Sequence, residues 1–439
     1  METTLKRAVS TPLLYFFILG DTLGAGVYVL IGSIAGESGG AVWLPLVTAL
    51  ALASLTAASY AELATRYPRA GGASHYATKA LGPAAGSLVG VCMLAAGIVS
   101  VGALARAFAG DYLRALVSLP AVAVVVVFLV ALALLNIRGI KESLSANVAA
   151  TLVEVGGLAL VIGLGTWVVL RGDADLGRLS EVGAGEQGVV AATLAGAVLA
   201  YYSFVGFETS VNLAEEVKDP RRSYPIALFG ALLTAGVVYL LLGLVTSASV
   251  PTDQLASSTG PLLEVVRVAG GVPEELFSVI ALVAVANGAL LTGIMSSRLA
   301  YGMARDGLLP APLTRVLPTR RTPWVAVIAT SALSLVLALT GEVAALAETL
   351  VLLLLIVFTA VNAALLVLRR RDDGEPDHFR VPVVVPVLGI ASCLLLFTRI
   401  DGEVWLRGLA LVGLGVLLAV VNAARRARGG GSAAPGPTA

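Results

Sequence analysis

Charged side chains are scarce in this chain of 439 residues. Asp, Glu, Lys and Arg together make up 13% of it, whereas soluble globular domains carry about 25%. Hydrophobic residues make up 58%. This composition excludes a soluble globular protein and predicts a polytopic membrane protein that lies in the lipid bilayer, with no nucleic-acid partner.

Cysteine and histidine are almost absent as well. The two cysteines, Cys92 and Cys393, lie inside apolar stretches, and the two histidines, His75 and His378, lie in polar segments. This placement does not fit a disulfide framework or a histidine metal centre. We therefore predict inert packing thiols, no metal site and no cofactor.

Long apolar stretches, in contrast, are abundant. A helix needs about 20 residues to cross a bilayer, so each stretch is interpreted as a membrane span. Polar segments divide the chain into twelve spans, at 12–36, 41–65, 83–108, 120–137, 145–170, 188–213, 225–249, 274–303, 323–340, 343–368, 382–400 and 404–424.

Lys and Arg are distributed unequally between the two sides of this arrangement. With residues 1–11 placed in the cytoplasm, the inner segments hold 22 of the 29 basic residues and the outer segments hold 7. Cytoplasmic loops carry an excess of Lys and Arg, so we predict a multi-pass protein of the cytoplasmic membrane with both termini inside. The Gly- and Pro-containing tail, 425–439, is predicted to be disordered and cytoplasmic.

Two of the spans contain glycine next to a carboxylate. The first contains Asp21 followed by Gly24, Ala25 and Gly26, and the sixth contains Gly206 followed by Glu208. Glycine costs about 1 kcal/mol inside a helix, and broken backbone at membrane depth is tolerated where it lines a cavity or is buried in protein. Both helices are therefore predicted to stop and restart around a binding site.

The two breaks lie five spans apart, which indicates a transporter built from inverted repeats. Because five is an odd number, the second set of five helices must lie inverted relative to the first. We predict repeats at 12–171 and 188–368, followed by two additional helices at 382–424.

Carboxylates outnumber bases deep inside the spans. Asp21, Glu154 and Glu208 lie well within theirs, and an ionisable group at that depth is a functional hypothesis by default. Glu154 has no base within three helical turns and is interpreted as a group that carries a proton or a cation. Glu208 is interpreted as a gate or a contact to a substrate amine. In both cases the alternative is a buried carboxyl group hydrogen-bonded within the protein.

Vicinal hydroxyl groups on span eight raise a second coupling hypothesis. Ser296 and Ser297 could coordinate a sodium ion together with backbone carbonyls from span one. The alternative is that both hydroxyls bond their own helix backbone, as is common in membrane helices. A proton is therefore predicted as the coupling ion, with sodium as the less favoured choice.

Four separated parts of the chain carry a family resemblance. They are GDTLGAGVY at 20–28, AELATRYPRAGG at 61–72, NIRGIKES at 136–143 with Asn147, and FVGFE at 204–208 with Glu215, Glu216, Pro220 and YGMARDG at 301–307. These segments resemble the amino acid–polyamine–organocation superfamily, most closely bacterial permeases related to the cationic amino acid transporters. The resemblance implies the leucine-transporter fold, a 5+5 inverted repeat with broken helices one and six plus two extra helices, and alternating access.

The resemblance also implies a substrate site between spans one, three, six, eight and ten. The groups that would hold the substrate carboxylate are Gly24, Ala25 and Gly26, and carbonyls around three residues would hold its amino group, namely Ser203, Phe204 and Phe207.

Two carboxylates depart from the family pattern. Glu154 stands where some relatives carry a lysine, and Asp21 stands where small residues are usual, so the coupling mechanism does not carry over. The resemblance makes the two acids neighbours, and acids that close share one proton.

The identity of the substrate is left open by two opposing signals. An apolar span ten at 350–358 and small residues on span three, Ala95, Ala96, Gly97 and Ser100, favour small or apolar side chains. The excess of acids favours cationic substrates or amines. We predict a secondary active transporter of an amino acid, with two alternatives: a cation-coupled carrier of an organic amine or polyamine, or a non-transporting sensor that binds an amino acid. An enzyme is not predicted, because no loop offers a nucleophile, a base and an orienting group together.

Overall fold

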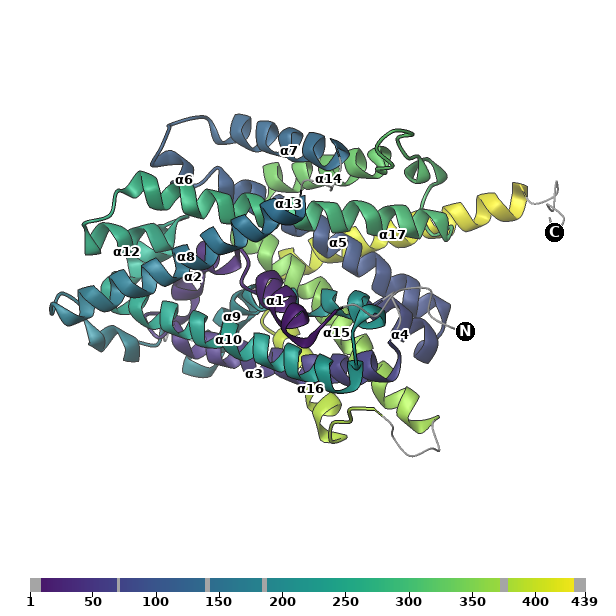
Figure 1. Cartoon of the computed structure of the whole chain (residues 1–439), viewed down its shortest axis with the longest axis horizontal. Coiled ribbons are helices and arrows are strands. Elements are labelled where there is room, and N and C mark those ends of the chain that lie inside the picture. The colour runs from purple at the N-terminus through teal and green to yellow at the C-terminus, as the bar shows by residue number, and fades with distance from the viewer. Residues whose placement is uncertain (1–8, 69–71, 139–142, 184–187, 372–377, 430–439) are drawn as a thin grey trace.

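The computed structural model describes residues 9–68, 72–138, 143–183, 188–371 and 378–429 (Figure 1). Over these ranges the regular elements are helices joined by turns and loops, and the β structure is limited to two isolated bridges. The longer helices are α1 (Thr11–Thr22), α2 (Gly26–Ser38), α3 (Trp43–Arg66), α5 (Pro83–Phe108), α7 (Ala121–Arg138), α8 (Ser143–Leu170), α9 (Gly188–Ser203), α10 (Pro220–Ser249), α13 (Glu274–Arg305), α14 (Trp324–Thr340), α15 (Val343–Arg370), α16 (Val384–Phe397) and α17 (Gly402–Gly429). Each predicted span coincides with one of these helices, with the pair α1 and α2, or with α9 and the 3₁₀ segment that follows it.

Nine helical segments in the described part of the chain are long and apolar enough to cross a membrane, and the bent pair α1 and α2 makes a tenth. A helix satisfies its backbone hydrogen bonds internally, which a lipid environment demands. The prediction of an all-helical, multi-pass membrane protein is therefore confirmed. Helices α14 and α16, with 17 and 14 residues, are shorter, so the count of twelve spans stays a prediction.

Several short helices lie in segments that the sequence analysis treated as loops. They are α4 (Gly72–Leu81), α6 (Asp111–Arg114), α11 (Thr252–Ser257), α12 (Pro261–Ala269) and the 3₁₀ segments η1 (Leu176–Ser180) and η3 (Ala311–Thr314). The 3₁₀ segment η2 (Phe207–Glu216) lies mostly inside the sixth predicted span, at 188–213. Helix α10 also begins at Pro220, five residues before the predicted span, because the fixed φ of proline suits a first helical turn.

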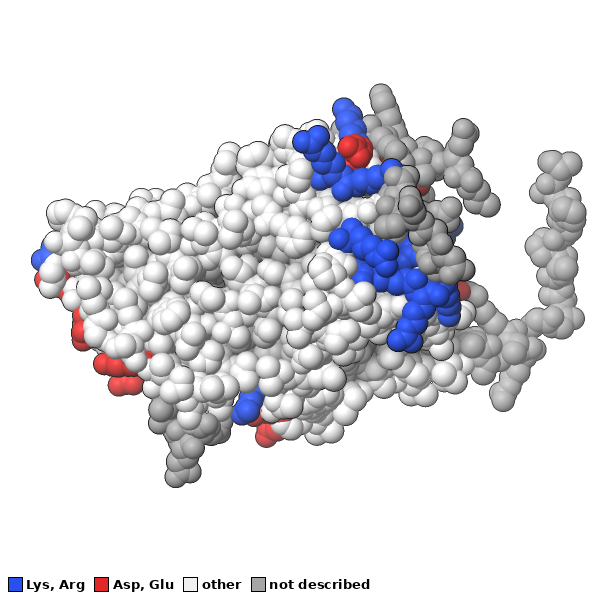
Figure 2. Space-filling view, turned by 90° about the horizontal axis from the view of Figure 1, so that it is seen from below, with Lys and Arg blue, Asp and Glu red and all other residues white. Residues whose placement is uncertain are grey.

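On the face drawn in Figure 2, most charged side chains lie toward the two ends of the molecule. Figure 2 shows Lys and Arg side chains gathered at the end toward which α17 extends in Figure 1, and a broad surface without charged side chains between the two ends. That surface is the one expected to contact lipid. The cytoplasmic placement of the termini stays a prediction. Helix α17 continues to Gly429, and the rest of the predicted tail, from residue 430, lies outside the described residues.

Helix α5 forms the centre of the bundle, packed against α13, α14 and α15. Small residues allow this close approach. A Cβ atom at Gly97 would lie 2.2 Å from Oγ of Ser296, and one at Gly102 would lie 3.0 Å from the carbonyl oxygen of Ser334. The glycines of α5 therefore bring α13 and α14 against it.

A buried ion pair joins α3 to α15. The Glu62 carboxylate accepts a hydrogen bond from Nε of Arg369 at 2.7 Å and a further bond from the same guanidinium group. It also accepts one from the N–H of Val381 at 2.8 Å, in the segment that leads to α16. The side chains of Glu62 and Arg369 are 0% and 7% exposed. This pair therefore fixes three parts of the chain to one another.

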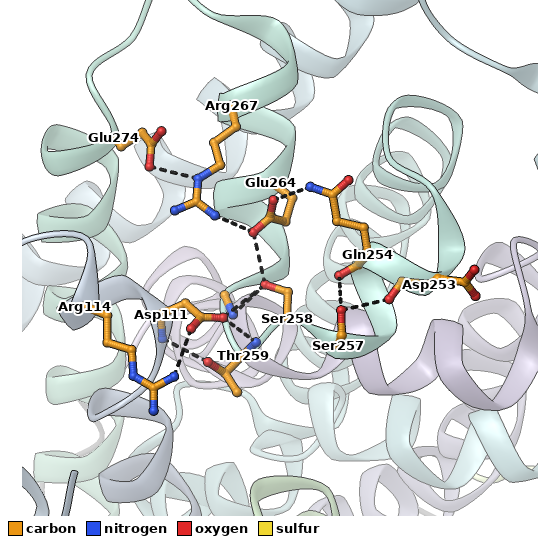
Figure 3. Close-up of polar contacts among 11 residues, drawn as sticks. Asp111, Arg114, Asp253, Gln254, Ser257, Ser258, Thr259, Glu264, Arg267 and Glu274 are labelled. Atoms are coloured by element: carbon orange, nitrogen blue, oxygen red, sulfur yellow. Dashed lines mark hydrogen bonds and ion pairs between the residues drawn. The ribbon is translucent and has the colours of Figure 1, made fainter. Parts of the chain in front are cut away.

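The opposite end of the molecule is closed by α6, α11 and α12. The Asp111 carboxylate accepts a hydrogen bond from the N–H of Thr259 at 2.8 Å, and the main-chain N–H of Asp111 donates to the Thr259 hydroxyl at 2.9 Å (Figure 3). Glu264 accepts from Gln254 at 2.6 Å and from Arg267 at 2.7 Å. These carboxylates are thus occupied by partners within the protein.

Candidate substrate site at the two helix breaks

The first break separates α1 from α2. Helix α1 ends at Thr22, α2 begins at Gly26, and the two axes differ in direction by 47°. The N–H of Leu23 still bonds to the carbonyl of Leu19 and so completes α1. The first N–H groups of a helix have no partner within it and carry a partial positive charge, so α2 presents donors at the break.

The second break separates α9 from η2. Gly206 has φ of +127°, a conformation that L side chains rarely adopt. A Cβ atom there would also lie 2.7 Å from the carbonyl oxygen of Asp21, so only glycine fits. The Glu208 carboxylate accepts the N–H of Gly206 at 2.9 Å and so caps the start of η2.

The two breaks are in direct contact. A Cβ atom at Gly26 would lie 2.9 Å from Cδ1 of Tyr202 and 3.1 Å from Cα of Ser203. On the other side of the first break, the Thr209 hydroxyl donates a hydrogen bond to the Asp21 carboxylate. The N–H groups at the start of α2 therefore lie beside the end of α9, where helix carbonyls lack partners within their own helix.

A cavity of about 560 Å³ lies against both breaks and against α4, α5, α13 and α15. This volume is within the range of about 300–1,000 Å³ that small-molecule sites occupy. The predicted site residues that line the cavity are Asp21, Gly24, Ala25, Gly26, Ser203, Glu208 and Ser296. The lining also includes Ala96, Gly97, Ser100, Leu350 and Leu354, from the two spans expected to form the side-chain pocket.

Two hydroxyl groups in the lining have no hydrogen-bond partner in the described part of the chain. They are Oγ1 of Thr22 and Oγ of Ser203, in side chains that are 1% and 2% exposed. A buried polar group without a partner costs about 1–3 kcal/mol. A polar ligand bound against these two hydroxyls would supply the missing partners.

Phe204 and Phe207 belong to the core and do not line the cavity. The Phe204 ring packs edge-on against Tyr239 at 5.3 Å, and the Phe207 ring stacks on Phe358 at 5.5 Å between ring centroids. Only their carbonyl groups are therefore left for a ligand, as the sequence analysis expected. The Phe207 carbonyl already accepts a hydrogen bond from Ser210 at 2.6 Å.

Glu154 lies on α8 and is 2% exposed, but it does not line the cavity. Its Oε1 atom has no hydrogen-bond partner among the described residues. The Tyr28 hydroxyl donates to the main-chain carbonyl of Glu154 at 2.6 Å, which ties α2 to α8. The Asp21 carboxylate accepts a hydrogen bond from Thr209. A proton shared between Asp21 and Glu154 therefore stays a prediction.

The two serines of span eight bond their own helix. The Ser296 hydroxyl donates to the carbonyl of Thr292 at 2.8 Å, and the Ser297 hydroxyl donates to that of Ile294 at 2.9 Å. This geometry favours the alternative stated for them over sodium coordination. Within the described ranges, no group of three or more His, Cys, Asp or Glu side chains is arranged to hold a metal ion.

Sequence reasoning missed several polar residues of the cavity lining, and Thr22, Tyr202 and Thr209 are the ones next to the breaks. Tyr202 shares a hydrogen bond of 3.1 Å with Ser100, and so links α9 to α5. All three stand within four residues of a predicted break. A polar residue next to a glycine break in an apolar span is the signal that identifies them.

Comparison with known proteins identifies the family of the chain. A family model described as amino acid permease matches residues 9–406. The chain belongs to this family. The predicted kinship with the amino acid–polyamine–organocation superfamily is thereby confirmed, and the family is one of permeases, not of enzymes.

Named relatives of this permease come from plants and bacteria. It is 33% identical over 387 residues to the vacuolar cationic amino acid transporter 4 of Arabidopsis thaliana, an alignment that covers 82% of this chain and 62% of the plant protein. It is 25% identical over 440 residues to the methylthioribose transporter of Bacillus subtilis, covering 94% and 93%. It is 26% identical over 448 residues to a branched-chain amino acid permease of the same bacterium, covering 95% and 93%.

Proposed function

We propose that this permease is a secondary active transporter that carries an amino acid across the cytoplasmic membrane by alternating access. The observation that supports this most is the contact between the two helix breaks beside one cavity, with Gly26 against Ser203. Donor groups at the start of α2 and acceptor groups at the end of α9 match the two charged groups that every α-amino acid carries.

The site residues have distinct roles in this proposal. The N–H groups of Gly24 and Ala25 in the break, and of Gly26 at the start of α2, bind the substrate carboxylate. Carbonyl groups of Ser203 and Phe204 at the end of α9 bind the ammonium group. The hydroxyls of Thr22 and Ser203, which have no partner among the described residues, make further hydrogen bonds to the substrate, because both residues line the cavity.

The architecture proposed is the leucine-transporter fold with 12 spans. Residues 12–171 form the first five-helix repeat and 188–368 the inverted second, with 382–424 as two additional helices. Each repeat would then begin with one of the two broken helices. Because helices of both repeats line the cavity, movement of one against the other would change which side of the membrane it opens to.

The coupling ion proposed is the proton, with Glu154 as the group that exchanges it. Glu154 is buried, one of its carboxylate oxygens has no partner among the described residues, and Tyr28 links its main chain to α2, the second half of the broken helix. Desolvation disfavours the charged form of such a group, so closing the site would favour capture of a proton. Asp21 and Glu208 are the other candidates, and sodium at Ser296 and Ser297 is less favoured because both hydroxyls bond their own helix.

Uptake by the purified protein in proteoliposomes tests this function. The panel contains neutral, cationic and acidic amino acids, their methyl esters, simple amines and polyamines, and methylthioribose, each with and without an inward proton gradient. We expect accumulation of at least one free amino acid and none of its methyl ester. Uptake of amines alone would favour the amine carrier, and saturable binding without flux would favour the sensor.

A further inference from the structure

The cavity holds an excess of negative charge. Among the described residues that line it, the charged side chains are Asp21, Glu208 and Arg298. Arg298 is exposed, so solvent screens its charge. The two carboxylates lie beside the helix breaks, Asp21 in the last turn of α1 and Glu208 in the first turn of η2.

The two carboxylates differ in burial and in the hydrogen bonds that they already make within the protein. Glu208 is 4% exposed, and its carboxylate caps the N–H of Gly206 at 2.9 Å. Asp21 is only partly buried, and one carboxylate oxygen accepts the neutral hydroxyl of Thr209. No donor among the described residues reaches its other oxygen, and no described cation pairs with it. Asp21 is therefore the carboxylate that is free to bind a ligand.

Neighbouring groups point to a ligand at the same place. The unpartnered hydroxyl of Thr22 directly follows Asp21 in the chain, and that of Ser203 lies across the contact between the breaks. Gly206 brings the second break against the main chain of Asp21, since a Cβ atom there would lie 2.7 Å from the Asp21 carbonyl oxygen. Asp21, Thr22 and Ser203 all line the same cavity, so one ligand bound at the two breaks would meet the carboxylate and both hydroxyls.

We propose that Asp21 is a specificity-determining residue that binds a positive charge on the substrate side chain, so that cationic amino acids with a flexible aliphatic side chain are the substrates. This inference rests on the proposed function, in which the helix ends at the two breaks already bind the α-carboxylate and the α-ammonium group. Asp21 is then left for a second cation. Leu350 and Leu354 line the same cavity and fit the aliphatic part of such a side chain.

Comparing lysine with norleucine isolates the contribution of the side-chain charge. The two side chains have the same number of carbon atoms and differ by the terminal ammonium group of lysine. Competition binding to the purified protein gives the two affinities. We expect lysine to bind about tenfold to a hundredfold more tightly, the range expected for a hydrogen bond to a charged partner. Asp21→Asn keeps an acceptor for Thr209 and should remove most of this preference, because lysine affinity should fall much more than norleucine affinity.

The matched control removes a carboxylate outside the cavity. Asp173 forms a surface ion pair with Arg171, and Asp173→Asn should leave the ratio of lysine to norleucine affinity unchanged. Thr209→Val supplies a second variant if Asp21→Asn does not fold. It keeps the Asp21 charge but removes its anchor, and should weaken lysine binding more than norleucine binding, so that the ratio of the two affinities falls.

The outcomes separate this inference from the function on which it rests. If the ratio of lysine to norleucine affinity is the same in the wild type and in Asp21→Asn, or if the wild type prefers norleucine, the role of Asp21 is overturned. The proposed transport function is then unaffected. Equal loss of both ligands in Asp21→Asn would also overturn it, because Asp21 would then bind the α-ammonium group. If the wild-type protein neither binds nor transports any amino acid, the proposed function itself fails.

Discussion

A single methyl group added at Gly26 tests whether the contact between the two helix breaks matters. In Gly26→Ala the new Cβ atom would lie 2.9 Å from Cδ1 of Tyr202 and 3.1 Å from Cα of Ser203. Carbon atoms in van der Waals contact are separated by about 3.5–4.0 Å. The Tyr202 ring can turn aside, but Cα of Ser203 belongs to the main chain, so the start of α2 must move away from the end of α9.

The size of the effect follows from this overlap. Overpacking of this kind costs about 1–3 kcal/mol, which corresponds to a loss of affinity of about 5-fold to 150-fold if the cost falls on the substrate site. We expect Gly26→Ala to lower both the thermal midpoint in detergent and the substrate affinity of the purified protein. Gly24→Ala is the matched comparison, because its nearest atom is the Asp21 carbonyl oxygen at 3.5 Å, an ordinary contact. Its thermal midpoint should equal that of the wild type. A Gly26→Ala protein with unchanged midpoint and affinity would refute the argument.

Three further predictions address coupling, stability and orientation. Glu154→Gln should retain substrate binding and exchange but lose accumulation driven by a pH gradient in proteoliposomes, with Glu208→Gln as the comparison. Pumping that survives in Glu154→Gln would pass the coupling role to Glu208 or Asp21. Glu62→Gln leaves the buried Arg369 without a charged partner, at a cost of about 3–5 kcal/mol, so the thermal midpoint should fall markedly. An unchanged midpoint would show that this pair contributes little. A cysteine placed at Ser432 should react with a membrane-impermeant maleimide only after lysis, and labelling of intact cells would reverse the predicted orientation.

Helix positions could be predicted from the sequence because apolar length decides them in a membrane. The short helices α4, α11 and α12 could not, since segments of 10, 6 and 9 residues form no long apolar run. Packing against neighbours stabilises them instead. A Cβ atom at Gly32 of α2 would lie 2.3 Å from the carbonyl oxygen of Leu255 in α11, a contact with no local signal in either segment.

The breaks of the site could be predicted as well, but the contacts between them could not. Glycine beside a carboxylate in an apolar span indicated both breaks, and the structure gives Gly206 a φ of +127°. The bond between Thr209 and Asp21 joins residues far apart in the chain, so only the packed structure reveals it. Burial of Glu154 followed from its place in an apolar span, whereas its separation from the cavity depends on how α8 packs.

Binding of a blocked substrate tests the central claim most directly. Take the amino acid that the uptake panel identifies, and measure the affinity of the purified protein for it, for its methyl ester and for its analogue without the α-amino group. If the ends of α2 and α9 hold the two charged groups, each change removes charge-assisted hydrogen bonds and should weaken binding by about tenfold or more. Equal affinity for the ester and the free amino acid would contradict a carboxylate site at the start of α2.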